Sequence, residues 1–534
     1  MLTFLWLDDT TANGRFIYAL DDAYIHLQMA TTLATHGVWG VSPQATVAAS
    51  SSPLWVLLLA TAHRISENFE IVPFIINVAG AAGLLFLMDW QGEALGWEGA
   101  SPSLRFCLLV WFVFLIPLPA LVFTGMEHVL HALLGLAFLG TAARYLWPPG
   151  EAPTADRPFL LMCLWAVLAV GIRYESLALV FPVVIVLLWR GEWRTGTMLG
   201  AAACLPVVGF GSFCWSRGGT FIPLSILVKT VGIFQGVPWY VTWLPGIKGT
   251  MRLFHCPSLL LLTGLGAYAL GKSRWDSPKG RPILGDRLSG AVALFLVAAA
   301  LQVEFGDIGW FFRYEAYLVV LGMLTAFPAF LRVLGIPLGP GPNQEFQRPP
   351  PRPARVLVLL ASLLLFERVG QATWATPLAY RNIGAQQIQV SRFLRQYASS
   401  APVALNDVGA TSFFSGKPIL DLWGLISPQV AMVRLRHAYD SAAIARLASE
   451  AGVESAVVFP EWFADYGGMP ASWIPVASWR IPRNVVCGSD TVVFYAVSPA
   501  TREHLETSLR RFSSSLPEGV QVTFTDPPPA KIGH

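Results

Sequence analysis

Two adjacent carboxylic acids, Asp21 and Asp22, are the residues of this sequence best suited to catalysis. They lie in a polar segment that is followed by Ser51-Ser-Pro-Leu-Trp55 and then by the first strongly apolar stretch. Two neighbouring carboxylates beside apolar segments are costly unless they are solvated, paired or used. One could act as a general base while the other orients a substrate or a divalent metal ion. Alternatively, both are solvated acids at the N-terminus of a helix that begins near Ala23.

A further acidic residue, Glu127, lies between two apolar segments and is followed by His128 and His131. The two histidines are three positions apart, so a helix would place them on one face. The three side chains could bind a metal ion, but a polar contact at the membrane interface is the interpretation that we favour.

Three cations also border apolar stretches. Arg173 precedes Glu175 and interrupts what would otherwise be one long apolar run, Lys229 lies in an apolar loop, and Arg313 precedes Tyr314. Each could extend to the lipid headgroups, and Arg173 could pair with Glu175. Because all three are expected on the same side as the acidic pair, they could together bind an anion such as a lipid phosphate.

The composition indicates which elements must position these residues. Of the 534 residues, 54% are hydrophobic and 13% are charged, and the mean hydropathy is +0.54, which excludes an ordinary soluble domain. The apolar runs are continuous and predict a polytopic α-helical membrane protein with about ten to twelve crossings. They lie near residues 53–66, 71–89, 104–122, 128–146, 158–172, 175–189, 196–214, 255–271, 288–303, 311–333 and 354–367. The net charge of +3 is too small to indicate a nucleic-acid partner.

The basic loops orient the chain, because loops rich in lysine and arginine stay in the cytoplasm. Residues 189–194, 272–287 and 331–355 are basic and are predicted to be cytoplasmic. Residues 216–236, 304–313 and everything after about 367 then lie outside. The protein is therefore expected in the cytoplasmic (inner) membrane, with its functional site on the extracytoplasmic face.

We predict two domains. Residues 1–367 form the transmembrane module, whose first extracytoplasmic loop covers about residues 8–52 and includes an interfacial helix at 23–36. Residues 368–534 form an extracytoplasmic α/β domain with a disordered tail beyond Asp526, because strand patterns at 402–406, 454–459 and 491–496 alternate with helix patterns at 441–451 and 501–512. Asp407 and Asp421 each follow a predicted strand and could contact a sugar, although turn and capping roles are favoured.

Several short motifs occur in a fixed order along the chain. They are Asp21-Asp-Ala-Tyr-Ile-His26, Gly37-Val-Trp-Gly-Val-Ser-Pro43, Ser51-Ser-Pro-Leu-Trp55, Gly125-Met-Glu127, Arg173-Tyr-Glu175, Lys229-Thr230, Arg313-Tyr314, Asp407-Val-Gly-Ala410 and Asp421-Leu-Trp-Gly-Leu425. In this order they resemble bacterial GT-C membrane glycosyltransferases, of the group related to the mycobacterial arabinofuranosyltransferases and, more distantly, to protein O-mannosyltransferases. That group usually has a complete helix before the acidic pair, whereas this sequence has only the apolar residues 1–7, so we expect its start to lie upstream.

The resemblance, which covers about residues 18–430, implies a polyprenyl-phosphate-linked sugar donor and an acidic catalytic residue in the first extracytoplasmic loop. The acceptor would be an extracytoplasmic glycan, lipid or protein, and membrane lipids would surround the helices. Asp21 or Asp22 would be the base, and Arg173, Lys229 and Arg313 would stabilise the phosphate charge. The other expected substrate-binding residues are Tyr24, His26, Glu127, Glu175, Tyr314, Asp407 and Trp423. No cofactor is predicted, apart from a possible divalent metal near the acidic pair.

Two other functions remain open. A transporter or flippase would move a lipid-linked or envelope substrate, but such proteins place charges near the membrane midplane within repeated, broken helices, and the sequence has no evident repeat. A non-catalytic scaffold would use the α/β domain to hold envelope enzymes. The three functions differ in whether a labelled lipid-linked sugar is transferred, moved or left unchanged.

Overall fold

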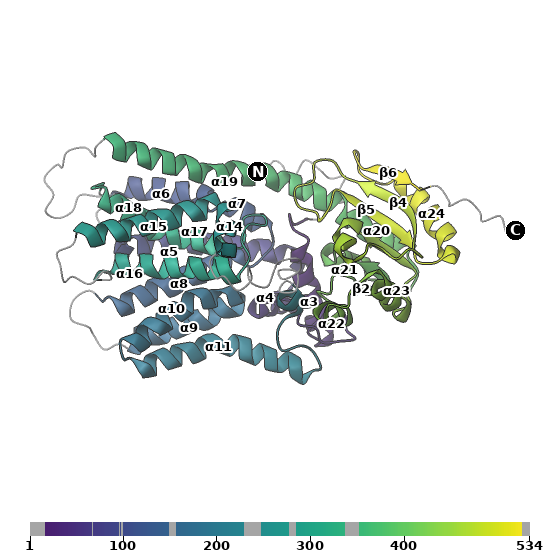
Figure 1. Ribbon diagram of the computed structural model, residues 1–534, viewed down its shortest axis with the longest axis horizontal. Coiled ribbons are helices and arrows are strands. Elements are labelled where there is room, and N and C mark those ends of the chain that lie inside the picture. The colour runs from purple at the N-terminus through teal and green to yellow at the C-terminus, as the bar shows by residue number, and fades with distance from the viewer. Residues whose placement is uncertain are drawn as a thin grey trace.

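The computed structural model describes residues 16–66, 68–95, 97, 100–148, 156–228, 247–276, 285–336 and 352–525. The described chain forms a bundle of long helices with a smaller α/β domain at one end (Figure 1). The apolar residues 1–7, Lys229 and the tail beyond Asp526 lie outside the described residues.

The bundle contains every apolar segment expected from the sequence. Its helices are α4 (Pro53–Ile65), α5 (Val72–Gly92), α6 (Pro102–Leu115), α7 (Leu118–Phe123), α8 (His128–Leu146), α9 (Asp156–Ile172), α10 (Leu177–Trp189), α11 (Trp193–Ser216), α14 (Ile247–Phe254), α15 (Pro257–Asp276), α16 (Arg287–Phe305), α17 (Ala316–Leu324), α18 (Ala326–Val333) and α19 (Arg352–Ala385). Within the described residues, five helical segments are long and apolar enough to cross a membrane, and four shorter helices are also apolar. Large apolar side chains such as Phe86 and Ile185 face outward, as expected of helices in contact with lipid.

The described ends of the basic segments lie at the end of the bundle away from the α/β domain (Figure 1). Arg190, at the end of α10, donates a hydrogen bond to the carbonyl of Leu146 at 2.7 Å. Arg287, at the start of α16, donates to the carbonyl of Trp147 at 3.2 Å. The sequence assigned these segments to one side of the membrane, and the described ends of the helices have that arrangement.

The α/β domain is built on a six-stranded sheet within residues 403–524. Its strands are β1 (Val403–Leu405), β2 (Ile419–Asp421), β3 (Ser455–Val458), β4 (Ile474–Arg480), β5 (Thr491–Ala496) and β6 (Gln521–Phe524), in the spatial order β2-β1-β3-β5-β4-β6. β1 is parallel to β2 and β3, and the other pairs are antiparallel. Its helices are α20 (Gln387–Tyr397), α21 (Gly409–Ser415), α22 (Pro428–Leu435), α23 (Ser441–Glu450) and α24 (Pro499–Ser513). The predicted strands and helices correspond to β1, β3, β5, α23 and α24.

Each face of this sheet is covered by apolar side chains. Consecutive residues of a strand point to opposite faces, so Leu405 packs with Phe393 and Phe512 from α20 and α24. Its neighbour Ala404 packs on the other face with Ile444 of α23. The short, fully buried β1 is therefore fixed in register, and the residues that follow it are held firmly in place.

The helix α3 (Asp22–His36) joins the two parts of the protein. The sequence predicted it to lie on a membrane surface, and this was wrong, because α4 packs on one side of it and α21 on another. Tyr24 and Leu27 are completely buried as a result. Protein rather than bilayer covers the apolar side chains of α3.

A second connection is α19, whose 34 residues correspond to ~50 Å at 1.5 Å per residue. It runs along the bundle and ends in the α/β domain (Figure 1). There Asn382 accepts a hydrogen bond from the Val485 amide at 2.9 Å. The expected domain boundary at residue 367 falls inside this single helix, so the two domains are joined without a flexible linker at that point.

Candidate active site

The first acidic residue of α3, Asp22, forms an ion pair with Arg313 where the bundle meets the α/β domain. The Asp22 side chain is 38% exposed, whereas that of Arg313 is only 3% exposed. The same Arg313 Nη2 also donates to the Tyr314 hydroxyl at 3.0 Å. Its Nε and Nη1 groups are buried and have no hydrogen-bond partner among the described residues. Buried N–H groups are normally paired, so two such groups without a partner on one guanidinium are unusual.

Arg173 lies next to this pair but is already neutralised. It has an extended backbone between α9 and α10, which ends the first helix and turns its side chain inward. Its Nη1 donates to Glu127 Oε1 at 2.6 Å, and its Nη2 pairs with Glu175. The ring of Tyr314 lies 5.4 Å from the Arg173 guanidinium and 4.8 Å from that of Arg313. The two arginines are therefore neighbours, but of the two only Arg313 has N–H groups without a partner in the described part of the chain.

His26 and two serines, Ser50 and Ser52, complete the site. His26 is one helical turn after Asp22, and its Nε2 is 2.7 Å from the Ser50 hydroxyl. Ser52 donates to Glu127 Oε1 at 2.8 Å. Burial lowers the pKa of His26, so its imidazole is neutral at pH 7. A neutral ring can orient polar groups but adds no positive charge beside the arginines.

Asp21 faces in another direction from Asp22, because successive residues of a helix are rotated by about 100°. Its two carboxylate oxygens accept hydrogen bonds from the backbone amides of Gly409 at 2.6 Å and Ala410 at 2.7 Å. A Cβ atom at Gly409 would collide with the Asp21 backbone and side chain, so only glycine permits this approach. Asp21 therefore fastens the start of α3 to the start of α21.

The Asp21 carboxylate also contacts Asp407, the first acidic residue after β1. Burial raises the pKa of Asp21, and burial together with the charge of Asp21 raises the pKa of Asp407 well above its usual range. The two buried carboxyl groups share a hydrogen bond. Gln387 donates a second hydrogen bond to Asp407 at 2.6 Å. The two carboxyl groups thus join the membrane module to the α/β domain.

Two of the expected substrate-binding residues, Tyr24 and Trp423, lie apart from this cluster. Tyr24 is buried, and its hydroxyl accepts a hydrogen bond from the Tyr18 amide at 2.9 Å. Trp423 packs within the α/β domain, 3.9 Å from the Arg434 guanidinium. Lys229 is outside the described residues. The structure thus gathers seven of the expected residues: Asp22, His26, Glu127, Arg173, Glu175, Arg313 and Tyr314.

Asp421 has the turn role that the sequence favoured. Its carboxylate accepts hydrogen bonds from the amides of Trp423 at 2.7 Å and Ile426 at 2.8 Å. Burial raises its pKa to about 6. These contacts shape the loop after β2 and leave the Asp421 side chain facing the protein interior.

Sequence reasoning missed a second buried ion pair, between Glu315 and Arg368. Glu315 and Arg368 both lie close to apolar segments, and ionisable residues in such places are a recognisable signal of function. Ser52 belongs to the motif Ser51-Ser-Pro-Leu-Trp55, but its contact with Glu127, and that of Ser50 with His26, were not predicted.

The arrangement does not fit a divalent metal ion beside the acidic pair. Both Asp21 oxygens accept backbone N–H groups, and Asp22 is paired with Arg313. In the described ranges, no three His, Cys, Asp or Glu side chains are grouped closely enough to bind a metal. We therefore assign no chemical step to a metal.

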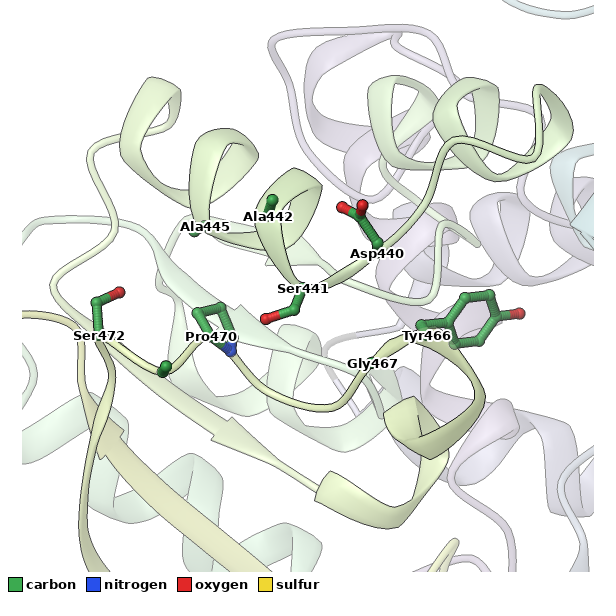
Figure 2. A pocket seen from close by; sticks show the side chains of 9 residues that line it. Asp440, Ser441, Ala442, Ala445, Tyr466, Gly467, Pro470 and Ser472 are labelled. Carbon is green, nitrogen blue, oxygen red and sulfur yellow. The ribbon is translucent and has the colours of Figure 1, made fainter.

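One shallow cavity of about 480 Å³ lies on the α/β domain, between the start of α23 and residues 466–472 (Figure 2). Ser441 faces the hollow, whereas the Tyr466 hydroxyl points away from it (Figure 2). The Asp440 carboxylate at its rim accepts a hydrogen bond from the Ala443 amide as the helix N-cap. None of the residues around Asp22 lines this cavity, so the cavity is separate from the Asp22–Arg313 cluster.

Comparison with solved structures identifies the architecture. The chain aligns over 98% of its length with 74% of the Archaeoglobus fulgidus oligosaccharyltransferase tethered to an acceptor peptide, with a TM-score of 0.51 and 11% identity. The chain has a GT-C glycosyltransferase fold. Together with its apolar helices, this fold makes it a membrane-embedded protein.

Two further GT-C structures are similar at lower scores. ArnT from Cupriavidus metallidurans, bound to undecaprenyl phosphate, aligns over 94% of this chain and 97% of its own, with 12% identity and a TM-score of 0.49. The arabinofuranosyltransferase AftD from Mycobacteria aligns over 93% of this chain and 39% of its own, with 14% identity and a TM-score of 0.42. Residues 381–495 match a family described as a domain of unknown function, DUF8728. No curated protein matched the sequence.

Proposed function

We propose that this protein is a membrane glycosyltransferase that moves a sugar from a polyprenyl-phosphate donor to an extracytoplasmic acceptor. The observation that carries the proposal is the Asp22–Arg313 pair, in which a partly exposed carboxylate touches a buried guanidinium with unused donors. A carboxylate and a cation held together provide what this reaction needs, namely a base for the acceptor and positive charge for the leaving group.

Arg313 binds the donor phosphate in this proposal. Its Nε and Nη1 groups supply two N–H donors, and charge-assisted hydrogen bonds contribute about 1.5–3 kcal/mol each. Arg173 is not a phosphate ligand, because Glu127 and Glu175 already pair with it. Its role is to hold the ring of Tyr314, which also contacts Arg313.

Asp22 acts as the general base. The acceptor hydroxyl loses its proton to the Asp22 carboxylate as its oxygen forms a bond to the anomeric carbon of the sugar. The bond from that carbon to the phosphate oxygen breaks, and its electrons remain on the phosphate, beside Arg313. A phosphate leaves without protonation by a strong acid, so no second carboxylic acid is required. Asp21 positions Asp22 by fixing the start of α3.

The site is proposed to face outside the cytoplasmic membrane. The basic residues Arg190 and Arg287 lie at the opposite end of the bundle, which supports a cytoplasmic location for that end. In this arrangement residues up to about 367 form the membrane module and the following residues form the extracytoplasmic domain, with α19 passing between them.

A transfer assay separates this function from its alternatives. The purified protein is placed in liposomes with a radiolabelled polyprenyl-phosphate sugar and an envelope extract as acceptor. Label in the acceptor fraction supports a glycosyltransferase, provided that Asp22→Asn abolishes it and Arg332→Gln, at an exposed position, does not. Movement of label across the bilayer without transfer would instead favour a flippase. If label is neither transferred nor moved, a scaffold is favoured.

A further inference from the structure

The segment before Arg313 has an unusual backbone. Four consecutive residues have positive φ angles: Gly309 at 83°, Trp310 at 33°, Phe311 at 57° and Phe312 at 64°. Glycine adopts this left-handed conformation freely, but for three bulky residues it is strained. Strained backbone persists only where surrounding contacts hold it, and such segments are concentrated at functional sites.

The buried Glu315–Arg368 pair holds both ends of this left-handed turn. Glu315 Oε2 accepts a hydrogen bond from the Gly309 amide at 2.7 Å. Arg368 Nη2 donates to the Phe312 carbonyl at 2.6 Å, and its Nη1 donates to Glu315 Oε1 at 2.5 Å. The two side chains are only 1% and 7% exposed. The turn is therefore fastened to α19, the helix that carries Arg368.

We infer that Arg368 and Glu315 are positioning residues, which hold the left-handed turn so that Arg313 faces Asp22 and the donor phosphate. The inference rests on the proposed function. A purely structural role is a poorer explanation, because apolar side chains of similar volume are commonly as stable as a buried ion pair. The pair also contacts the backbone at both ends of the turn, at the Gly309 amide and the Phe312 carbonyl, and these two contacts fix the shape of the turn.

Hydrogen exchange tests the structural half of the inference in the full chain without any ligand. Arg368→Lys keeps the charge beside Glu315 but removes the forked contact with the Phe312 carbonyl. The peptide that covers residues 309–314 should exchange faster in this variant, while peptides from α8 and α16 exchange as in the parent. Arg332→Lys, at an exposed position, is the matched control and should leave the turn unchanged. Unaltered exchange in the turn of the Arg368 variant would overturn the inference.

Binding of undecaprenyl phosphate in detergent micelles tests the functional half. Arg368→Lys should weaken binding about tenfold or more, as should Arg313→Gln. Because Arg368 acts through Arg313, combining the two changes should weaken binding no further than Arg313→Gln alone. Additive losses, or parental affinity in Arg368→Lys, would overturn the inference.

A paired variant covers the case in which Arg368→Lys does not fold. Arg368→Met with Glu315→Leu removes both charges together, so no unpaired charge stays buried, and the same loss of protection and affinity is expected. If the parent protein does not bind undecaprenyl phosphate, the proposed function fails, and the exchange experiment still decides whether the pair holds the turn.

Discussion

Replacing the two adjacent acids one at a time should separate a catalytic role from a positioning role. Asp22→Asn removes the base but keeps an amide oxygen that can accept a hydrogen bond from Arg313, so the buried guanidinium retains a partner. A general base contributes about 10²–10⁴-fold to a rate, which corresponds to roughly 3–5 kcal/mol of activation free energy. We expect turnover to fall by about this factor while the protein unfolds at nearly the parental temperature.

Asp21→Asn should have the opposite balance of effects. The carboxylate accepts one N–H on each oxygen, from Gly409 and from Ala410, and an asparagine offers only one acceptor oxygen. A buried N–H left without a partner costs about 1–3 kcal/mol. The variant should therefore unfold at a lower temperature, with the α/β domain less firmly attached, and turnover per folded molecule should fall less than in Asp22→Asn.

Two assays decide between these outcomes. Transfer of radiolabelled sugar measures turnover, and size-exclusion chromatography after graded heating measures the folded fraction. Parental melting with abolished turnover in Asp21→Asn, together with an active Asp22→Asn, would refute the assignment of Asp22 as the base. Asp440→Asn, at the N-cap of a distant helix, controls for the loss of a surface charge.

Three other predictions follow from the same contacts. Burial raises the folded-state pKa of Asp407 above its ordinary value of 3.8, so the folded protein keeps a proton that the unfolded chain releases. The stability of the fold should therefore fall as the pH rises from about 4 through the raised pKa. Asp407→Asn, whose side chain is a neutral donor, should flatten this fall in thermal unfolding scans. Gly409→Ala should lower the unfolding temperature, because its Cβ collides with Asp21, and parental melting would contradict that geometry. Arg313→Gln should weaken donor binding about tenfold or more with little loss of yield. Arg173→Gln should mainly lower yield, because it leaves the buried Glu127 and the partly exposed Glu175 without their cation. Equal donor affinities in the two variants would contradict the different roles assigned to the two arginines.

The sequence predicted much of the membrane module because hydropathy depends on local composition. Each apolar run became helix, since a backbone in hydrocarbon must satisfy its own hydrogen bonds. The ionisable triplet Arg173-Tyr-Glu175 was recognised as an interruption, and it does end α9. The charge of Arg173 also indicated an acidic partner, and Glu175 is one of the two carboxylates that pair with it. Features set by neighbouring residues were therefore accessible from the sequence.

Features set by distant residues were not. The different roles of Asp21 and Asp22 depend on Gly409 and Ala410, which are hundreds of positions away and become neighbours only through the packing of α21 on α3. The strand β4 was missed because Pro475, at an irregularity in the sheet, interrupts its pattern. The left-handed turn before Arg313 gave no signal, because only Gly309 in it is a residue that favours positive φ.

The Asp22–Arg313 pair is held from two sides by different parts of the chain. The α/β domain fixes Asp21, and therefore the start of α3, through the first amides of α21. The helix α19 fixes the turn before Arg313 through Arg368. In a transfer reaction the base and the cation act on the same sugar, so their positions relative to each other must stay fixed. Anchoring each to a separate rigid element keeps that separation without using the substrate to organise the site, which is the condition under which preorganised charges accelerate a reaction most.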